Sequence, residues 1–400
     1  MRFVSCVCTP YHELLDRRLR LVLVTLGLAC AVAAVAATAR AAEPPGSPPD
    51  PPVSTDPSAS SQGRGGGGAR DDTASLQRKL DKGGTITLTA LAGGACYQTR
   101  GLWVSKDGTT ITSSNGACIQ YLGRSTDARL RSGDGDLIYA NAIFFVNRSS
   151  MTAATPQHIR ISNLRLIVPT GTADEQGVNY GVLVAGTDVT VDNVRVEGAP
   201  LDALQVTGRA NGSSCSCASQ VVISHDTISA GRRNGISIIS GIGVTLDSNT
   251  IQGAGNPTLL AGAAVADTGP WAGIDVEPDL TFYPIKQLTI TRNTIQNNGG
   301  AGILLVFDLN GSYPDVADQV VLDSNTITKN GLSSGSFLHG GVCLQGGQAD
   351  GNGHLSVTNN QITNNIGYGL CTTGYNMQVS YSGNTISGNS SGNQQTFQQI

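Results

Sequence analysis

Two short patterns alternate along most of the chain, and each is typical of a β-strand. In the first, β-branched residues precede an Asn and further strand residues follow it. In the second, a Gly precedes a strand in which apolar positions alternate with others. The first pattern occurs at Asn163, Asn193, Asn249, Asn293, Asn325, Asn360 and Asn384, with Asp226 once in the same slot. The second occurs at Gly181, Gly235, Gly273, Gly302, Gly341 and Gly369, with Ala203 in one place.

This alternation predicts a solenoid of stacked strands. A strand-rich repeat of roughly 20 to 45 residues without a long helical period is typical of repeat architectures. The chain lacks the Leu spacing of leucine-rich repeats, and its two Trp are too few for a propeller. An inward Asn at each corner can bond its amide to the rungs above and below, and Asn tolerates left-handed backbone. We therefore expect the Asn residues to form a ladder.

A short helix is expected where order begins, at residue 71. Asp72 or Thr73 can cap it, and Gly83 ends it before a strand over residues 85–91. Such a helix can cover the open end of a stacked sheet, whose edge groups are otherwise unpaired.

The composition agrees with many strands and tight turns. The chain has 51 Gly, only 14% charged residues and 5% aromatic residues. Its net charge of −4 gives no basic face, so we expect no nucleic-acid partner.

The N-terminus predicts export. Residues 1–41 have the basic, apolar and small-residue regions of a signal peptide, the alternative being a membrane anchor. Residues 42–70 are rich in Pro, Gly and Ser and are expected to be a disordered linker. We expect the folded domain over residues 71–386 and a polar tail over 387–400. The protein is therefore predicted to be secreted, without stable membrane insertion after cleavage; the sequence leaves its oligomeric state open.

Cysteine usage agrees with export. Nine Cys are present, of which three fall in the predicted signal peptide. An even number remains, which favours disulfides, whereas zinc would want a CxxC pair that does not occur. The remaining residues are Cys96, Cys118, Cys215, Cys217, Cys343 and Cys371.

The N-terminal capping segment, the Asn ladder and the Gly rows together resemble the pectin-lyase-like superfamily of right-handed parallel β-helices. The resemblance covers nearly all of residues 71–386 and implies an all-β fold active on polysaccharides. Cys96 and Cys118 occupy the same motif one rung apart, and Cys343 and Cys371 share a slot in successive rows. Parallel strands lie about 4.8 Å apart, which a disulfide tolerates. We expect these two pairs, and Cys215 with Cys217.

One Gly row carries two carboxylates. Ile274 and Val276 are expected to point inward, so that Asp275 and Glu277 share the outer face, roughly 6.5–7 Å apart at the backbone. The equivalent positions of other rows hold uncharged residues, such as Leu183, Ser237 and Leu304. Two neighbouring carboxylates repel each other, so one should titrate at high pH unless a cation intervenes.

Polar and aromatic residues cluster around this row in the predicted arrangement. Arg232 and Arg233, one rung earlier, are expected to orient the substrate or to bind an acidic group on it. The non-repeating segment 252–270 is expected to be an excursion beside the row. The residues predicted to bind a sugar are Asn234, Asp202, Trp271, Tyr283 and Asp308.

Two mechanisms fit the pair. In a glycoside hydrolase, Asp275 and Glu277 act as acid and base, or as acid and nucleophile, and no cofactor is required. The pair also resembles calcium-dependent lyases of the superfamily, where acidic residues i and i+2 join an Asn of the preceding rung. That resemblance implies Ca²⁺ held by Asp275, Glu277 and Asn234, with Lys286 or an Arg as the base. The row also resembles a motif of phage-depolymerase-like β-helices.

Structural explanations compete with these roles. Asp275 and Glu277 can pair with Arg232 and Arg233 across rungs, and Trp271 can close the core beneath its loop. The hypothesis favoured by the sequence is a secreted β-helix enzyme that cleaves a polysaccharide. The other class of function is a non-catalytic glycan-binding or surface-adhesion protein.

Overall fold

The computed structural model describes residues 70–394 with short gaps. The residues outside this description are 1–69, 124, 126, 132–136, 151, 170–179, 212–213, 230, 257, 259–268, 281–282, 308–316, 334–338, 347–352, 373–376 and 395–400. The predicted signal peptide, the linker to residue 69 and Asp308 lie outside the described residues.

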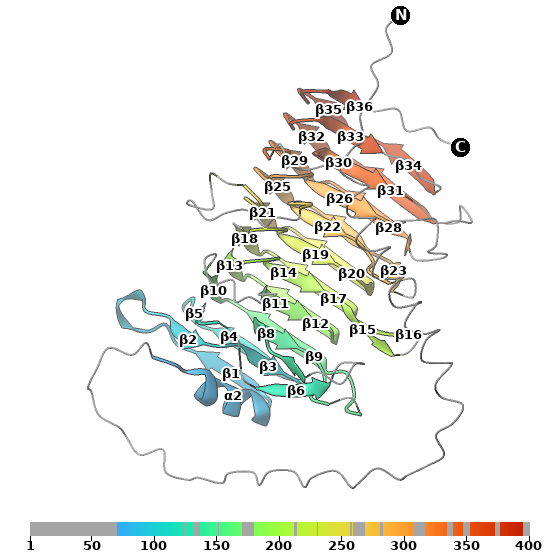
Figure 1. The fold of residues 1–400 in the computed structure, drawn as a ribbon. Helices are drawn as coiled ribbons and strands as arrows, with labels where there is room; N and C mark the ends of the chain where they lie inside the picture. Colours follow the sequence, from blue (N-terminus) through green and yellow to red (C-terminus); the bar gives the residue numbers. More distant parts are fainter. Residues whose placement is uncertain are drawn as a thin grey trace, which may run out of the picture. The chain divides into compact units, whose positions relative to one another are not determined.

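The described chain is a parallel β-helix, in which each rung gives one strand to each of three sheets (Figure 1). Sheet A contains β1 (Thr85–Leu88), β4 (Thr110–Ser113), β9 (Gln157–Ser162), β12 (Thr187–Asp192), β17 (Ser219–Ser224), β20 (Gly241–Asp247), β24 (Thr289–Thr291), β28 (Val320–Asp323), β31 (His354–Thr358) and β34 (Gln378–Ser382), with β23 (Ile285–Lys286) and β27 (Ala317–Asp318) beside them.

The second and third sheets follow the same order along the chain. Sheet B contains β2 (Tyr97–Thr99), β5 (Cys118–Tyr121), β10 (Arg165–Val168), β13 (Arg195–Gly198), β18 (Thr227–Ser229), β21 (Thr250–Gln252), β25 (Thr294–Gln296), β29 (Thr326–Thr328), β32 (Gln361–Thr363) and β35 (Thr385–Ser387). Sheet C contains β3 (Leu102–Val104), β8 (Ala142–Val146), β11 (Tyr180–Val184), β14 (Leu204–Val206), β19 (Ile236–Ile238), β22 (Ile274–Val276), β26 (Ile303–Val306), β30 (Gly340–Gln345), β33 (Tyr368–Thr372) and β36 (Gly392–Gln394).

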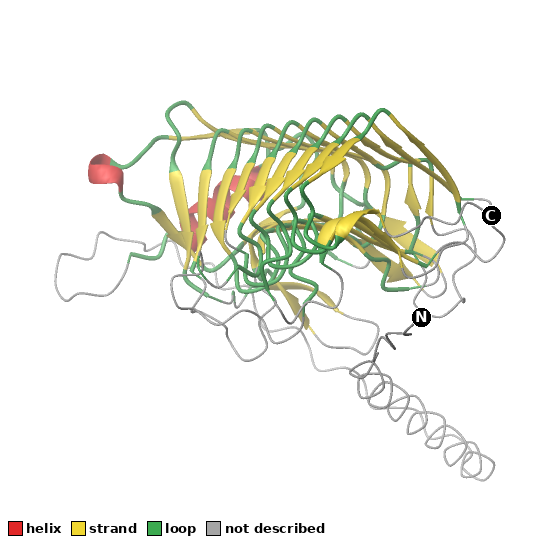
Figure 2. Ribbon diagram, turned by 90° about the horizontal axis from the view of Figure 1, so that it is seen from above, coloured by secondary structure: helices red, strands yellow, loops and turns green. Residues whose placement is uncertain are grey.

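Two antiparallel hairpins leave the rungs, β6 (Ala128–Arg131) with β7 (Leu137–Tyr139) and β15 (Gly208–Asn211) with β16 (Ser214–Cys217). Seen from above, the turns of successive rungs follow one another in rows (Figure 2). The repeat read from the sequence is therefore the rung of the helix.

The core explains the Gly rows. Inward Ile and Val side chains of the three sheets form one continuous hydrophobic cluster. A Cβ on Gly235 would lie 2.6 Å from Ile251 Cγ2, and one on Gly273 would lie 2.6 Å from Ile295 Cγ2. Gly is required at these corners because the backbone passes directly over a core side chain.

The predicted Asn ladder is present at the corner between sheets A and B. Its members are Asn249, Asn293, Asn325, Asn360 and Asn384, and each Nδ2 donates to the next Oδ1 over 2.9–3.0 Å. A second ladder of Asn298, Asn330, Asn365 and Asn389 lines the corner between sheets B and C. The second ladder was not predicted, although Asn recurs there at the same spacing.

Two residues assigned to the ladder lie one position away from it. The strand register aligns Ser162 with Asp192 and Ser224, so Asn163 and Asn193 follow in the exposed corner column. Both have left-handed backbone, with φ of 57° and 53°. The ladder slot in their rungs is filled by the buried Leu164 and Val194 instead.

The N-terminal helix α2 (Thr73–Lys82) covers the first strand of sheet C, as predicted. Gln77 donates from Nε2 to the carbonyl of Trp103 at 2.9 Å and accepts its N–H at 2.8 Å. Asp72 occupies the N-cap position, as predicted, but its side chain makes no capping hydrogen bond, and Asp71 accepts the Thr73 N–H. Asp72 instead accepts the backbone N–H of Gln98 in strand β2.

The three predicted disulfides are present. Cys96–Cys118, Cys215–Cys217 and Cys343–Cys371 have Cα–Cα distances of 4.5, 5.1 and 4.6 Å. The C-terminal boundary is corrected, because strand β36 pairs with β33 beyond Ile386.

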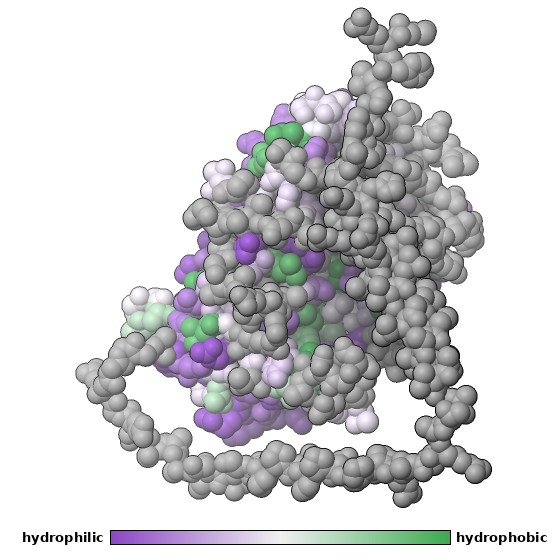
Figure 3. All heavy atoms as spheres, viewed as in Figure 1, coloured by the Kyte–Doolittle hydropathy of each residue, from purple (hydrophilic) through white to green (hydrophobic). Residues whose placement is uncertain are grey.

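Exposed large hydrophobic side chains are scattered over the described surface. They are Val222, Ile242, Leu280, Leu332, Ile366 and Tyr381. On the face drawn in Figure 3, hydrophilic and hydrophobic residues are interspersed. Within the described residues, every helix is too short or too polar to cross a membrane.

Candidate active site on the outer face of sheet C

The outer face of sheet C carries a column of side chains, one from each rung. In register order they are Trp103, Phe145, Leu183, Gln205, Ser237, Asp275, Leu304, Cys343 and Cys371. Both ends of the column are apolar, and its three polar members are consecutive. The predicted carboxylate row is the last of these three, so the polar part of the column marks the candidate site.

Asp275 is held by the rung before it. Ile274 and Val276 lie in the core, as the alternation predicts, while Asp275 lies outside that cluster but is only 1% exposed. Asn234 donates from Nδ2 to Asp275 Oδ2 at 2.8 Å and to Ser237 Oγ at 3.1 Å. Asn234 is kept in place by the N–H of Ala272, which donates to its Oδ1 at 3.0 Å.

The other carboxyl oxygen of Asp275 is buried without a hydrogen-bond partner. Burial, and then the charge of Glu277, raise the pKa of Asp275 well above its ordinary value, and Arg233 opposes them. Such a setting favours the protonated form of the carboxyl group, since an ionised oxygen without a donor is costly to bury. Asp275 is therefore the group of the predicted pair that can give a proton.

Arg233 pairs with Asp202 rather than with the carboxylate pair. Its Nε and Nη2 donate to the two Asp202 oxygens over 2.8 and 2.5 Å. Asp202 is fully buried and also accepts the N–H of Asn234 at 3.1 Å. Asp202, which was predicted to bind substrate, is thus the counter-ion that fixes Arg233 and the turn carrying Asn234.

The remaining predicted residues are partly brought together. Glu277 is half-buried, and its N–H donates to the carbonyl of Ile238 at 3.1 Å. Arg232 is half-buried in the turn before Asn234, where its N–H donates to the carbonyl of Ala199.

The two aromatic residues do not present open ring faces. Trp271 is 8% exposed, and a Cβ on Gly255 would lie 2.3 Å from its Cβ, so it packs directly on that turn. Tyr283 is 7% exposed and donates from its hydroxyl to the carbonyl of Gly208 at 3.4 Å. Both rings are buried in the structure, which favours a packing role over the predicted contact with a sugar.

Tyr180 belongs to the site and was missed. It is 5% exposed, at the start of strand β11 and two rungs before Asn234 in the same column. Burial raises the pKa of Tyr180, and the charge of Asp202 adds to this. Its place directly before Gly181, the slot that Asp202 and Asn234 fill in their rows, was the available signal.

The arrangement does not fit calcium at Asp275, Glu277 and Asn234. The backbone N–H of Ala272 donates to Asn234 Oδ1 and so fixes the orientation of the amide. Asn234 therefore presents its NH₂ group, and not its oxygen, to Asp275. A Ca²⁺ ligand would have to be that oxygen and an ionised carboxylate. Across the described part of the chain, no group of three His, Cys, Asp or Glu is placed to hold a metal.

The sequence matches the model of one protein family, described as right handed beta helix region, over residues 141–390. No curated protein sequence matches the chain.

Solved structures with a similar fold include three from phages and a bacterium. The active domain of tailspike protein 2 from bacteriophage CBA120 is 10% identical with a TM-score of 0.49, covering 80% of this chain and 41% of that one. The chain therefore spans about two fifths of that tailspike domain. The A-module of the Azotobacter vinelandii mannuronan C-5 epimerase AlgE4 is 16% identical with a TM-score of 0.44, covering 82% of this chain and 94% of that one. The tailspike gp49 of the Acinetobacter baumannii phage Fri1, a capsular polysaccharide depolymerase, is 15% identical with a TM-score of 0.46, covering 82% of this chain and 61% of that one.

Proposed function

We propose that this chain, which belongs to the right-handed β-helix family, is a secreted enzyme that cleaves a polysaccharide by glycoside hydrolysis. The observation that carries the proposal is the buried carboxyl of Asp275, which has one oxygen without a hydrogen-bond partner and whose pKa is raised by burial. A glycosidase needs such a group as general acid, beside a second carboxylate that acts as base or nucleophile. Glu277 on the same outer face supplies the second carboxylate.

The protein supports the acid by fixing it and by balancing charge around it. Asn234 holds Asp275 Oδ2, which leaves Oδ1 as the atom able to donate to a glycosidic oxygen. The Asp202–Arg233 pair keeps a positive guanidinium near Asp275 and fixes the turn that carries Asn234. This is the polar support that holds a catalytic group in one geometry.

The test uses a panel of polysaccharides, with and without EDTA. We expect reducing ends to appear without EDTA sensitivity, and no ultraviolet absorbance from an unsaturated uronate. Asp275→Asn should abolish the product while Asp226→Asn, which changes another buried carboxyl whose pKa is also raised by burial, should not. Equal activity of Asp275→Asn and wild type overturns the proposal, and an unsaturated product replaces hydrolysis with elimination.

A non-catalytic glycan-binding function is the second candidate. The observation in its favour is the low exposure of Asp275, because a substrate must reach the carboxyl for catalysis. Saturable binding of a glycan that is never shortened, unchanged in Asp275→Asn, would establish that function instead.

A further inference from the structure

A surface hollow lies at the corner between sheets A and B, on a different part of the helix from Asp275. The polar side chains that line it are Ser113, Ser114, Asn163, Arg165, Asn193 and Arg195. Four residues separate β4 from β5 at this corner, whereas two separate β9 from β10 and β12 from β13. The longer turn in one rung leaves room beside the two shorter turns that follow.

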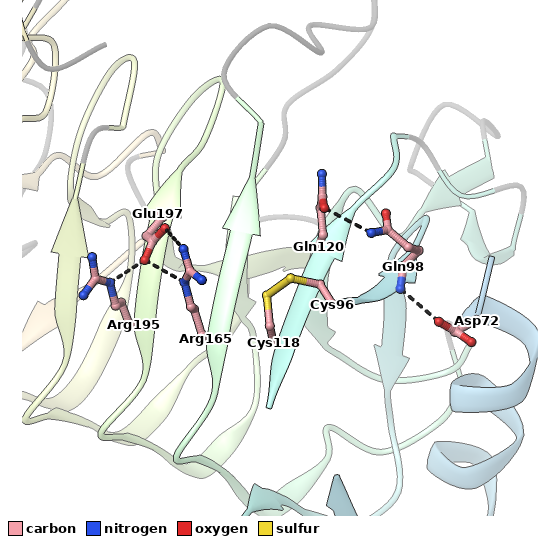
Figure 4. Close-up of a disulfide and its surroundings, with 8 residues drawn as sticks. All are labelled: Asp72, Cys96, Gln98, Cys118, Gln120, Arg165, Arg195 and Glu197. Atoms are coloured by element: carbon pink, nitrogen blue, oxygen red, sulfur yellow. Dashed lines mark hydrogen bonds and ion pairs between the residues drawn. A yellow bond between two sulfur atoms is a disulfide. The ribbon is translucent and has the colours of Figure 1, made fainter. Parts of the chain in front are cut away.

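Two arginines lie side by side along one edge of the hollow. Arg165 and Arg195 are register partners on β10 and β13, and Glu197 lies between them (Figure 4). Arg165 donates from Nε and Nη2 to the two Glu197 oxygens at 2.9 and 2.8 Å, and Arg195 Nε contacts the same carboxylate. The bond from Arg165 lowers the pKa of Glu197, so the carboxylate stays ionised and fully engaged.

This trio keeps one net positive charge and spare donors. Glu197 balances one guanidinium, while Arg165 Nη1 and both terminal nitrogens of Arg195 are not needed for its three contacts. The two arginine side chains are 46% and 61% exposed, which leaves them open to a ligand. The neighbouring Asp192 does not cancel the charge freely, because Arg160 and His225 already hold it.

The asparagines next to the arginines are fixed by each other. Asn193 donates from Nδ2 to Asn163 Oδ1 at 2.7 Å, and Asn163 donates to Thr112 Oγ1 at 3.3 Å. Their left-handed backbone places both amides on the exposed corner. The side of the hollow formed by the asparagines and arginines thus belongs to regular rungs, so little ordering of these side chains is needed on binding.

We propose that this hollow binds the anionic group of an acidic polysaccharide, either a uronate carboxylate or a sulfate ester. Paired guanidinium groups recognise planar or tetrahedral oxyanions through several charge-assisted hydrogen bonds, and the Asn and Ser side chains suit the sugar hydroxyls around them. The choice of a polysaccharide rests on the proposed function, whereas the anionic character rests on the trio alone. The hollow is an anchoring site away from the reacting carboxyls and selects acidic chains.

The experiment measures binding by calorimetry in the full chain carrying Asp275→Asn, so that cleavage cannot intervene. The probes are oligogalacturonate, a sulfated oligosaccharide and a neutral glucan of equal length. We expect one or both acidic probes to bind, more weakly as salt rises. Arg165→Gln with Arg195→Gln should weaken that binding at least about tenfold, because two or more charge-assisted bonds are lost.

Arg292→Gln is the matched control, because Arg292 is also 61% exposed and also paired with one carboxylate, Asp247, outside the hollow. It should leave binding unchanged. Glu197→Gln should tighten binding of the acidic probes several-fold, since both guanidinium groups are then released. Equal binding of the neutral glucan, an unchanged affinity in the double variant, or weaker binding in Glu197→Gln would each overturn the proposal. Because product formation is absent from this assay, its failure is distinct from failure of the hydrolase proposal.

Discussion

Asp226 and Asp275 are two buried carboxyl groups with opposite explanations. Asp226 is 1% exposed in the ladder between sheets A and B, and Asp275 is 1% exposed on the outer face of sheet C. Burial raises the pKa of each well above its ordinary value. Each has one oxygen without a hydrogen-bond partner. The degree of burial and the direction of the pKa shift do not distinguish the two groups.

The repeat explains Asp226. Its Oδ1 accepts the Val194 N–H at 2.6 Å, and its own N–H donates to Asn249 Oδ1 at 2.8 Å, as in the asparagine rungs. Its Oδ2 takes the place that Nδ2 has in the asparagine rungs. There the Nδ2 donates to a backbone carbonyl of the preceding rung, as Asn249 Nδ2 does to the carbonyl of Ile223. Asp226 Oδ2 is therefore unpartnered because a carboxylate oxygen lacks the hydrogen that an asparagine amide would donate at this position of the ladder.

The repeat does not explain Asp275. Its register neighbours are Ser237 and Leu304, and nothing in the other rungs calls for a carboxyl there. It also has a dedicated partner in Asn234, which in turn depends on Asp202 and Ala272. A buried acid that interrupts a repeat and is supported from the neighbouring rungs indicates function, whereas one that fits the repeat indicates structure.

The largest expected effect separates these two acids by activity. Asp275→Asn keeps the shape and the hydrogen bond capacity but cannot give a proton, so the rate should fall about 10²- to 10⁴-fold. Asp226→Asn should retain wild-type rate. Initial rates of reducing-end release on the active polysaccharide decide the matter, and Glu277→Gln should also lower the rate. Similar losses in Asp226→Asn and Asp275→Asn would show that both changes act through the fold.

The next effect concerns the ladder itself. Asn293→Ala removes donors to the carbonyls of Leu246 and Thr291 and to Asn325 Oδ1, together with the acceptor of the Asn249 N–H. Several buried groups lose their partners at once, so the free energy of unfolding should fall by about 3 kcal/mol. Denaturant unfolding measures the change. A loss below about 1 kcal/mol would mean that water replaces the amide.

A smaller effect, with the opposite sign, is expected for Asp226→Asn at neutral pH. The new amide completes the ladder and should raise the free energy of unfolding by about 1 to 2 kcal/mol at pH 7. The folded pKa of Asp226 lies above its unfolded value near 4, so the folded state binds the extra proton. Its contribution is fully present below about pH 4 and is lost as pH rises through the folded pKa.

The pH dependence is the control for this variant. The stability difference between Asp226→Asn and wild type should widen from about pH 4 toward neutral pH. A constant difference, or one that narrows as pH rises, would contradict a protonated Asp226 in the folded state. Thermal unfolding at a series of pH values gives the curve.

The fold could be predicted from the sequence because the same residue types recur at the same positions of successive rungs. Each Gly corner and each ladder Asn occurs many times, so the period could be read without any tertiary information, and the cysteine pairs followed from the same register. The error at Asn163 and Asn193 has a physical cause. Two adjacent corner positions both favour Asn, one for left-handed backbone and the other for inward amide bonding, and only strand register distinguishes them.

The candidate site was less predictable because it depends on contacts across rungs. The outer-face position of Asp275 followed from alternation, but its burial did not. The partner of Arg233 could not be chosen between Asp202, Asp275 and Glu277 from spacing, because all three fall within neighbouring rungs on one face. Tyr180 was missed because its slot, directly before Gly181, matches those of Asp202 and Asn234 only when the three rows are aligned with one another.

The smallest expected effect tests the register at the corner. Asn193→Ala should cost about 1 kcal/mol, because Ala at a φ of 53° lacks the tolerance of Asn for left-handed backbone and loses the bond to Asn163. Asn193→Gly should stay within about 0.5 kcal/mol of wild type, since Gly adopts that backbone readily. Denaturant unfolding beside Asn293→Ala makes the comparison direct. A loss of stability in Asn193→Ala as large as in Asn293→Ala would place Asn193 in the ladder after all. A smaller loss in Asn193→Ala would show that Asn193 serves the left-handed corner, whereas Asn293 bonds the rungs of the ladder.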